Sequence, residues 1–179
     1  MEQLTPMMQQ YMETKNEYKD CILFYRLGDF YEMFFDDAIC AHKELELTLT
    51  GKSCGLKERA PMCGVPFHSA ETYINRLVER GYKVAICEQV EDPKLAKGLV
   101  KREVTRIVTP GTNCFTGSLD ETRNNYLMGI VSVDHSFGIS IVDVTTGEYM
   151  LTEVESVSKL LDEVNKYMPA EIICNDSFY

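Results

Sequence analysis

Apolar residues along this chain recur with two periods, one typical of helices and one typical of strands. A Thr-Pro pair forms a favourable helix start, and apolar residues then fall at helical spacing, which predicts a helix over residues 5–18. The runs 21–27 and 30–35 are rich in aromatic and aliphatic residues and are separated by Gly28-Asp29. A glycine and an aspartate between two such runs predict a β-hairpin.

The rest of the first 110 residues alternates between helical and extended patterns. Acidic residues favour a helix N-terminus at the start of a second apolar period, and a serine and a glycine bracket a third helix. Residues 51–60 are polar and contain glycine, so we expect a loop there, followed by a rigid turn over 61–66. The predicted elements are a helix over 36–45, a short strand over 47–50, a helix from Ser69 to about Arg80, and strands over 83–88 and 103–108.

The pattern of apolar and polar residues changes after Pro110. Residues 111–123 show no convincing periodicity and contain glycine, serine and polar residues, which predicts a linker. Beyond the linker we expect three antiparallel strands joined by short turns, an amphipathic helix, and one more strand parallel to the first. The predicted strands span 126–134, 137–144, 148–154 and 171–174, and the helix spans 156–167.

The predicted hairpin tip holds the most informative side chains. Phe30 and Glu32 are two residues apart, so on a strand they point to the same face of the sheet. An aromatic ring beside a carboxylate can stack on a nucleobase and hydrogen-bond its edge. An aromatic residue in a strand is more often part of a hydrophobic core, however, and a single glutamate is usually a solvated charge. Local patterning leaves both interpretations open.

Five ordered blocks of sequence carry a resemblance to a known family. The blocks are Thr-Pro-Met-Met-Gln-Gln-Tyr at 5–11, the region 24–38 around Gly-Asp-Phe-Tyr-Glu, Pro-Met-Cys-Gly-Val-Pro at 61–66, Ala-Ile-Cys-Glu-Gln-Val at 85–90, and the block at 102–112 that ends in Thr-Pro-Gly-Thr. Together they resemble the N-terminal mismatch-recognition domain of the MutS family of DNA mismatch-repair proteins. The Phe-x-Glu motif of that family falls on Phe30 and Glu32.

The resemblance implies an α/β fold in two domains. Residues 1–110 are expected to form the mismatch-recognition domain, a mixed-sheet α/β domain flanked by helices. Residues 111–123 would be the linker, and residues 124–179 the first half of a ribonuclease H-like connector domain, truncated at the end of the chain. The sequence contains no Gly-x-x-x-x-Gly-Lys-[Ser/Thr] phosphate loop, and the clamp, lever and ATPase parts of the family are absent. We therefore expect no enzymatic activity and no cofactor here, with ATP and magnesium belonging to the full-length protein.

The resemblance also implies a function. Phe30 would enter the minor groove as an aromatic wedge at a mismatched or unpaired base, where poor stacking makes the duplex easier to kink. Glu32 would hydrogen-bond the displaced base. Further candidates for DNA binding are Met62, which the family places close to the wedge, and the cations Lys52, Lys57 and Arg59. The expected partners are mismatched duplex DNA, a second protomer in the full-length protein, and a downstream repair protein docked on the connector.

The net charge of −10 opposes nucleic-acid binding, but the charges are unevenly distributed. Residues 1–110 contain 15 Lys and Arg against 17 Asp and Glu, whereas residues 111–179 contain 3 against 11. Because phosphate neutralisation supplies most non-specific affinity, we expect weak DNA binding from this chain alone. The acidic second half suits docking of proteins, so the alternative function is a protein-interaction module of a MutS-like paralogue without mismatch specificity.

Metal-dependent chemistry is less well supported. Magnesium could be held by the acidic residues Asp29, Glu32, Asp36 and Asp37. However, Asp29 suits a turn, and Asp36-Asp37 suits the start of a helix. Asp134 and Asp143 are similar in type to the metal-binding carboxylates of ribonuclease H enzymes, without the rest of an acidic constellation.

Cysteine usage indicates a reducing compartment. The seven cysteines form no Cys-x-x-Cys pair, and neither they nor the three histidines have metal-ligand spacing, so we expect no disulfide and no zinc site. No run approaches the roughly 18 apolar residues of a membrane span, and the N-terminus lacks the pattern of a secretory signal. These features predict a cytoplasmic protein without a membrane partner.

Overall fold

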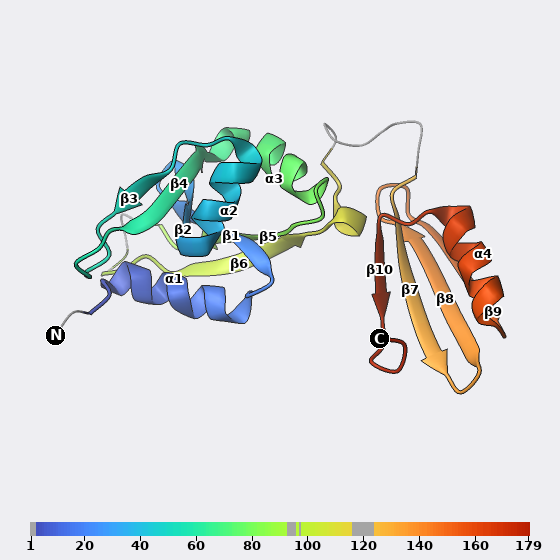
Figure 1. The fold of residues 1–179 in the computed structure, drawn as a ribbon. Coiled ribbons are helices and arrows are strands. Elements are labelled where there is room, and N and C mark those ends of the chain that lie inside the picture. The colour runs from blue at the N-terminus through green and yellow to red at the C-terminus, as the bar shows by residue number, and fades with distance from the viewer. Residues whose placement is uncertain (1–2, 93–95, 97, 116–123) are drawn as a thin grey trace. The chain divides into compact units, whose positions relative to one another are not determined.

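The computed structural model describes residues 3–92, 96, 98–115 and 124–179. The chain forms two compact units, Met1–Val108 and Thr109–Tyr179. Each unit is built on one mixed sheet with helices packed against it (Figure 1). The predicted mixed α/β fold is therefore confirmed.

The first unit is organised around a six-stranded sheet with the strand order β3-β4-β2-β1-β5-β6. Strands β1 and β5 are parallel, and the other neighbours are antiparallel. The strands are β1 (Cys21–Leu27), β2 (Phe30–Phe34), β3 (Thr50–Lys52), β4 (Ala60–Pro66), β5 (Lys83–Gln89) and β6 (Arg102–Val108). The helices are α1 (Pro6–Glu17), α2 (Phe35–Leu45), α3 (Ala70–Val78) and the 3-10 turn η1 (Phe67–Ser69).

The helices cover the two faces of this sheet. Tyr25 and Phe34 point to one face, where they pack with Met8 and Tyr11 of α1. The opposite face carries side chains such as Met33 and is covered by α2 and α3 (Figure 1). Coverage on both faces explains why the first five residues of β1 are all apolar or aromatic and all buried.

The structure corrects the sequence-based prediction around β3 and β4. The strand predicted over 47–50 is misplaced, because the strand is Thr50–Lys52, which shares only Thr50 with the prediction and continues into the region predicted as a loop. Residues 61–66, predicted as a turn, lie in β4, which pairs with both β2 and β3. Glycine and proline obscure the extended pattern, although proline is tolerated where a strand ends or meets an edge strand.

The helix starts were predicted correctly, including the N-cap residues of α1 and α3. Thr5 and Ser69 occupy the N-cap positions of α1 and α3, yet neither side chain accepts a capping hydrogen bond. The Ser69 hydroxyl instead donates to the carbonyl of Pro66 at 3.2 Å. Helix α3 ends at Val78, two residues before the predicted end.

The second unit has a four-stranded sheet in the order β10-β7-β8-β9, in which β10 is parallel to β7 as predicted. Its elements are β7 (Tyr126–Val133), β8 (Ser136–Asp143), β9 (Glu148–Val154), α4 (Val157–Tyr167) and β10 (Glu171–Cys174). Leu160 of α4 packs on the buried side chains of β7 and β8. The Ser156 hydroxyl caps α4 by accepting the Lys159 N–H at 3.3 Å.

The start of the predicted linker has regular structure. Pro110–Thr112 forms the 3-10 turn η2, in which the Thr112 hydroxyl accepts the Thr109 N–H at 3.0 Å, and Gly111 is buried. The Gly111 N–H donates to the carboxylate of Glu171 at 3.0 Å, so this turn belongs to the second unit. Residues 116–123 of the predicted linker lie outside the described residues.

Candidate nucleic-acid interface

Phe30 stands at the tip of a tight hairpin. Leu27 of β1 pairs directly with Phe30 of β2, which leaves Gly28-Asp29 as a two-residue turn. Gly28 has a φ of 59°, which glycine adopts without strain, and a positive φ at the first position is the geometry of a type II′ hairpin turn. The predicted hairpin is confirmed, and it brings Phe30 to the first position after the turn.

Burial changes along one face of β2. Phe30, Glu32 and Phe34 alternate with the buried Tyr31 and Met33, so the first three share a face of the sheet. Phe34 is only 1% exposed. Phe30 is 47% exposed, and the interpretation of its ring as core is therefore wrong.

Helix α1 accounts for this gradient. The Tyr11 ring meets the Phe34 ring edge-on with centroids 4.9 Å apart, so α1 seals the far end of this face. Phe30 has no place in that core cluster and projects from the hairpin end of the same face. One strand thus carries a structural phenylalanine and an exposed one on the same side.

A hollow of about 290 Å³ lies beside Phe30. Its lining consists of Phe30, Glu32, Thr48, Thr50, Met62, Cys63 and Gly64. Gly64 lies directly across from Glu32 in the β2–β4 pair. A Cβ atom at Gly64 would come within 3.1 Å of the Tyr31 carbonyl oxygen and 3.4 Å of Glu32 Cγ, so the missing side chain leaves room for the Glu32 side chain.

The Glu32 carboxylate is paired with a cation. Lys52 Nζ lies 2.5 Å from Glu32 Oε2, and it also lies 5.6 Å from the centroid of the Phe34 ring. Lys52 therefore neutralises the carboxylate in this structure, where the sequence analysis assigned it to a DNA phosphate. The pair joins β3 to β2 across β4, so it depends on the register of three strands.

The structure gathers some of the predicted site residues and separates others. Met62 lines the hollow with Phe30 and Glu32, and the Thr50 hydroxyl donates to the Met62 carbonyl at 3.1 Å. Lys52 does not line the hollow but contacts Glu32 through its ammonium group. The remaining two cations, Lys57 and Arg59, are exposed in the loop between β3 and β4 and do not line the hollow.

The back of the hairpin carries a polar network that sequence analysis missed. The Tyr31 hydroxyl donates to the Glu88 carboxylate, and Arg26 lies over both the Tyr31 and Phe67 rings. Burial, followed by the hydrogen bond to Glu88, raises the pKa of Tyr31 to about 12. These contacts join residues that are far apart in the chain, so spacing along the sequence does not reveal them. The one available signal was that Phe67 directly follows the Pro-Met-Cys-Gly-Val-Pro block.

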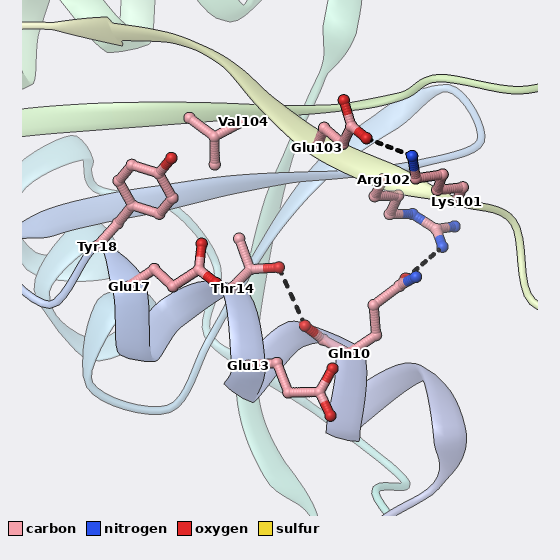
Figure 2. A pocket seen from close by; sticks show the side chains of 9 residues that line it. All are labelled: Gln10, Glu13, Thr14, Glu17, Tyr18, Lys101, Arg102, Glu103 and Val104. Carbon is pink, nitrogen blue, oxygen red and sulfur yellow. Dashed lines mark hydrogen bonds and ion pairs between the residues drawn. The ribbon is translucent and has the colours of Figure 1, made fainter.

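A second hollow, of about 430 Å³, lies between α1 and β6 (Figure 2). Its two cations are engaged: Lys101 Nζ lies 2.5 Å from the Glu103 carboxylate, and Arg102 donates to the Gln10 side-chain oxygen at 3.0 Å. Glu13 and Glu17 add two more carboxylates to the lining. Because acidic residues outnumber basic ones there, this hollow suits DNA phosphates less well than the surface beside Phe30.

Two of the acidic residues considered as metal ligands, Asp37 and Asp143, have structural partners. Asp37 is buried, accepts the Leu23 N–H at 2.9 Å and lies 2.9 Å from Lys15 Nζ. Asp143 accepts hydrogen bonds from the hydroxyl and N–H of Thr145, at 2.6 and 2.8 Å, and so fixes the β8–β9 turn.

Asp134 and Asp143 cannot share a metal ion. Asp143 pairs with Tyr126 at one end of the β7–β8 hairpin, whereas Asp134 lies in the turn at the other end. Seven residues of strand separate these ends, about 23 Å at the usual rise. Within the described ranges, no group of three or more His, Cys, Asp or Glu residues could hold a metal ion.

The cysteines are free thiols, four of them buried: Cys21, Cys54, Cys63 and Cys87. Burial raises the pKa of the Cys63 thiol to about 12, which keeps it protonated and unreactive at neutral pH. In the part of the chain that the structure describes, every helix is too short or too polar to cross a membrane.

Comparison with known proteins identifies the family. MutS domain I matches residues 5–115, and MutS domain II matches residues 125–179. Similar proteins, each named DNA mismatch repair protein MutS, occur in Lachnoclostridium phytofermentans and Acetivibrio thermocellus. The first is 72% identical over 179 residues and the second 63% identical over 182 residues, and both alignments cover 100% of this chain.

A third such protein, from Clostridium tetani, is 58% identical over 174 residues, which cover 96% of this chain. The alignments cover 19%, 21% and 20% of these three relatives, so the chain spans about one fifth of their length. The two matched regions correspond to domains I and II of the family. With both units matched, the chain belongs to the MutS family of DNA mismatch repair proteins, of which it comprises domains I and II.

Proposed function

We propose that the first unit recognises mismatched or unpaired bases in duplex DNA by inserting Phe30 as an aromatic wedge, with Glu32 as its hydrogen-bonding neighbour. The observation that carries this proposal is the exposure of the Phe30 ring at a hairpin tip, beside a carboxylate on the same face. A ring in this position can reach into a groove without unfolding any part of the core. Phe34, four residues further along the same strand, is buried and cannot reach a groove.

The wedge reads deformability. A mismatched step stacks poorly, so unstacking it costs less than unstacking a matched step, and an inserted apolar side chain kinks the duplex there. Stacking of a base on an aromatic ring contributes about 1–3 kcal/mol. That energy offsets the cost of opening a mismatch more readily than the cost of opening a matched pair.

Glu32 and Lys52 would have different roles in DNA binding: Glu32 would contact a base edge and Lys52 a phosphate. A lone carboxylate near phosphates is unfavourable, but Lys52 neutralises Glu32 in the free protein. When a mismatched duplex binds, Lys52 would turn from Glu32 to a phosphate, which leaves Glu32 to accept a hydrogen bond from a base edge, whereas on matched DNA Lys52 would stay with Glu32. Met62 would form the wall of the minor-groove contact, and Lys57 and Arg59 on the exposed loop would approach the backbone.

The remaining partners belong to the whole protein. We propose that a second protomer, ATP and magnesium act in the full-length protein, and that a downstream repair protein docks on the second unit. The seven free thiols suit a cytoplasmic location.

A protein-interaction role has its own support in the second unit. Tyr149 and Leu151 on β9 and Val157 and Leu161 on α4 are exposed apolar side chains. Contiguous patches of exposed apolar side chains are typical of surfaces that bind proteins, and these side chains would contribute to such a patch. This role can operate alongside mismatch recognition, because the two functions would use different units.

The test is a pair of titrations with the full-length protein. Dissociation constants for a duplex with one unpaired base and for its matched counterpart should differ for the wild type, and the ratio should fall close to one for Phe30→Ala. If Phe30→Ala keeps the wild-type ratio, Phe30 is not the wedge, and a unit without mismatch specificity becomes the better description.

A further inference from the structure

The turn that carries Phe30 is held from the opposite face of the sheet. Arg26 pairs in register with Tyr31, the residue after Phe30, so the Arg26 side chain leaves the sheet on the face away from the Phe30 ring. Its Nε donates to the Gly28 carbonyl oxygen at 2.5 Å. Its guanidinium lies over the Phe67 ring, with Cζ 3.7 Å from the ring centroid.

Both residues of the turn accept a hydrogen bond, one from the Arg26 side chain and one from the Phe67 backbone. The Gly28 carbonyl accepts the hydrogen bond from Arg26, and the Asp29 carbonyl accepts the Phe67 N–H at 2.9 Å. The stack of Arg26 on Phe67 therefore links the two attachments. A turn bonded through both of its carbonyls has little freedom to rock.

The Arg26 guanidinium is itself held in place. Arg26 NH1 lies 3.9 Å from the Glu88 carboxylate, which also accepts the Tyr31 hydroxyl. The Arg102 side chain donates to the Arg26 carbonyl at 2.8 Å, and the Arg26 side chain is only 17% exposed. A planar guanidinium stacked on a ring and paired with a carboxylate has a defined orientation.

We propose that Arg26 is a positioning residue for mismatch recognition: stacked on Phe67 and bonded to Gly28, it holds the hairpin turn so that the Phe30 ring projects from the surface. This inference rests on the proposed wedge function of Phe30. A half-exposed ring beside an apolar-lined hollow of about 290 Å³ gains free energy by folding down into it. Fixing the turn opposes that collapse, and a wedge ordered in advance binds more tightly because less freedom is lost on insertion.

The experiment uses the full-length protein and the matched control Arg80→Met. Arg80 also donates to a backbone carbonyl and to a carboxylate, both of Glu44, but it lies after α3 and has no contact with the turn. Arg26→Met should lower the ratio of mismatched to matched affinity about tenfold, which corresponds to about 1.4 kcal/mol. Arg80→Met should leave the ratio at its wild-type value.

Two further readouts separate positioning from direct DNA contact. If Arg26 acts through Phe30, matched-duplex affinity and its salt dependence stay at wild-type values, and Arg26→Met causes no further loss of mismatched-duplex affinity in the Phe30→Ala background. If Arg26 instead binds a phosphate, both duplexes weaken equally and the slope of log K against log salt falls by about 0.9. That result would overturn the proposal.

Arg26→Lys guards against a folding defect in Arg26→Met. Lysine keeps the charge near Glu88 but loses the planar stack on Phe67 and the Nε donor, so it should lower the ratio in the same direction. A folded Arg26→Lys protein, verified by its melting curve, with the wild-type ratio would also overturn the proposal. Failure of the wedge function itself appears separately, as wild-type discrimination in Phe30→Ala.

Discussion

Lys52 Nζ lies 2.5 Å from Glu32 Oε2, so the carboxylate beside the exposed Phe30 ring has a cation as its partner in the free protein. The two side chains come from β3 and β2, and Gly64 of the intervening β4, directly opposite Glu32, leaves room for the Glu32 side chain. Because the two charges are paired, the surface beside Phe30 is locally neutral. Releasing either partner should change DNA binding in a defined direction.

Glu32→Gln should raise the affinity of the full-length protein for matched DNA while lowering its preference for mismatches. The substitution frees Lys52 and removes a charge that repels phosphate, so we expect an increase of about 2- to 5-fold, the scale of a partly exposed charge pair. The salt dependence should steepen as Lys52 gains a phosphate. Glu44→Gln frees Arg80 in the same way far from the hairpin, and it should change neither quantity. Unchanged matched affinity in Glu32→Gln would contradict this view of the pair.

Phe30 and Phe34 allow a controlled comparison of how much an exposed and a buried ring contribute to stability. They share a strand and a face, but the first is 47% exposed and the second 1%. Phe34→Ala should lower the free energy of unfolding by about 3–5 kcal/mol, as for a buried aromatic residue, because it opens a cavity against Tyr11. Phe30→Ala should lower it by about 1 kcal/mol or less. Urea unfolding of both variants tests this difference, and a large loss for Phe30→Ala would contradict the small stability contribution expected of a half-exposed ring.

Gly64 should tolerate alanine poorly. A Cβ there would lie 3.1 Å from the Tyr31 carbonyl oxygen and 3.4 Å from Glu32 Cγ, so Gly64→Ala shifts the Tyr31 backbone by a few tenths of an ångström and crowds the Glu32 side chain. We expect a loss of about 1 kcal/mol in stability and a lower mismatch preference. Gly138 in β8 is the control, because a Cβ there meets nothing closer than the Val131 carbonyl oxygen at 3.9 Å. Gly138→Ala should be neutral or stabilising, and equal effects of the two substitutions would contradict the steric argument.

The sequence predicted the elements whose signal is local. The hairpin follows from two aromatic runs around Gly28-Asp29, and β7 to β10 follow from alternating apolar residues and short turns. The short strand β3 was misplaced, because three residues at a sheet edge, one of them Gly51, carry almost no periodic signal. Its position is set by pairing with β4 and not by its own composition.

The candidate site was only partly predictable for the same reason. Residues that are two positions apart on a strand share a face, so Phe30 and Glu32 could be placed together from sequence alone. The contact of Lys52 with Glu32 needs the register of β3, β4 and β2, and the stack of Arg26 on Phe67 joins residues 41 positions apart. Such contacts arise from topology, which spacing along the chain does not encode.

The buried Asp37 should make the first unit less stable as pH rises. Burial raises the pKa of this carboxyl, and the hydrogen bond from the Leu23 N–H and the nearby Lys15 ammonium only partly oppose the shift. The folded state then binds its proton more tightly than the unfolded chain, in which the pKa is about 3.9. The stability contributed by the protonated form is therefore complete below about pH 3.9 and is lost as pH rises through the raised folded-state pKa.

Asp37→Asn tests this pH dependence. Asparagine cannot ionise, so the free energy of unfolding of wild type minus variant, measured by urea titration from pH 4 to 7, should fall as pH rises and then level off. Asp36→Asn removes an exposed carboxylate from the same turn of α2 and should keep the wild-type pH dependence, because Asp37 remains. A difference between wild type and Asp37→Asn that rises with pH would show that Lys15 and the Leu23 N–H outweigh burial. The carboxylate would then stabilise the junction of α1, β1 and α2 in its charged form.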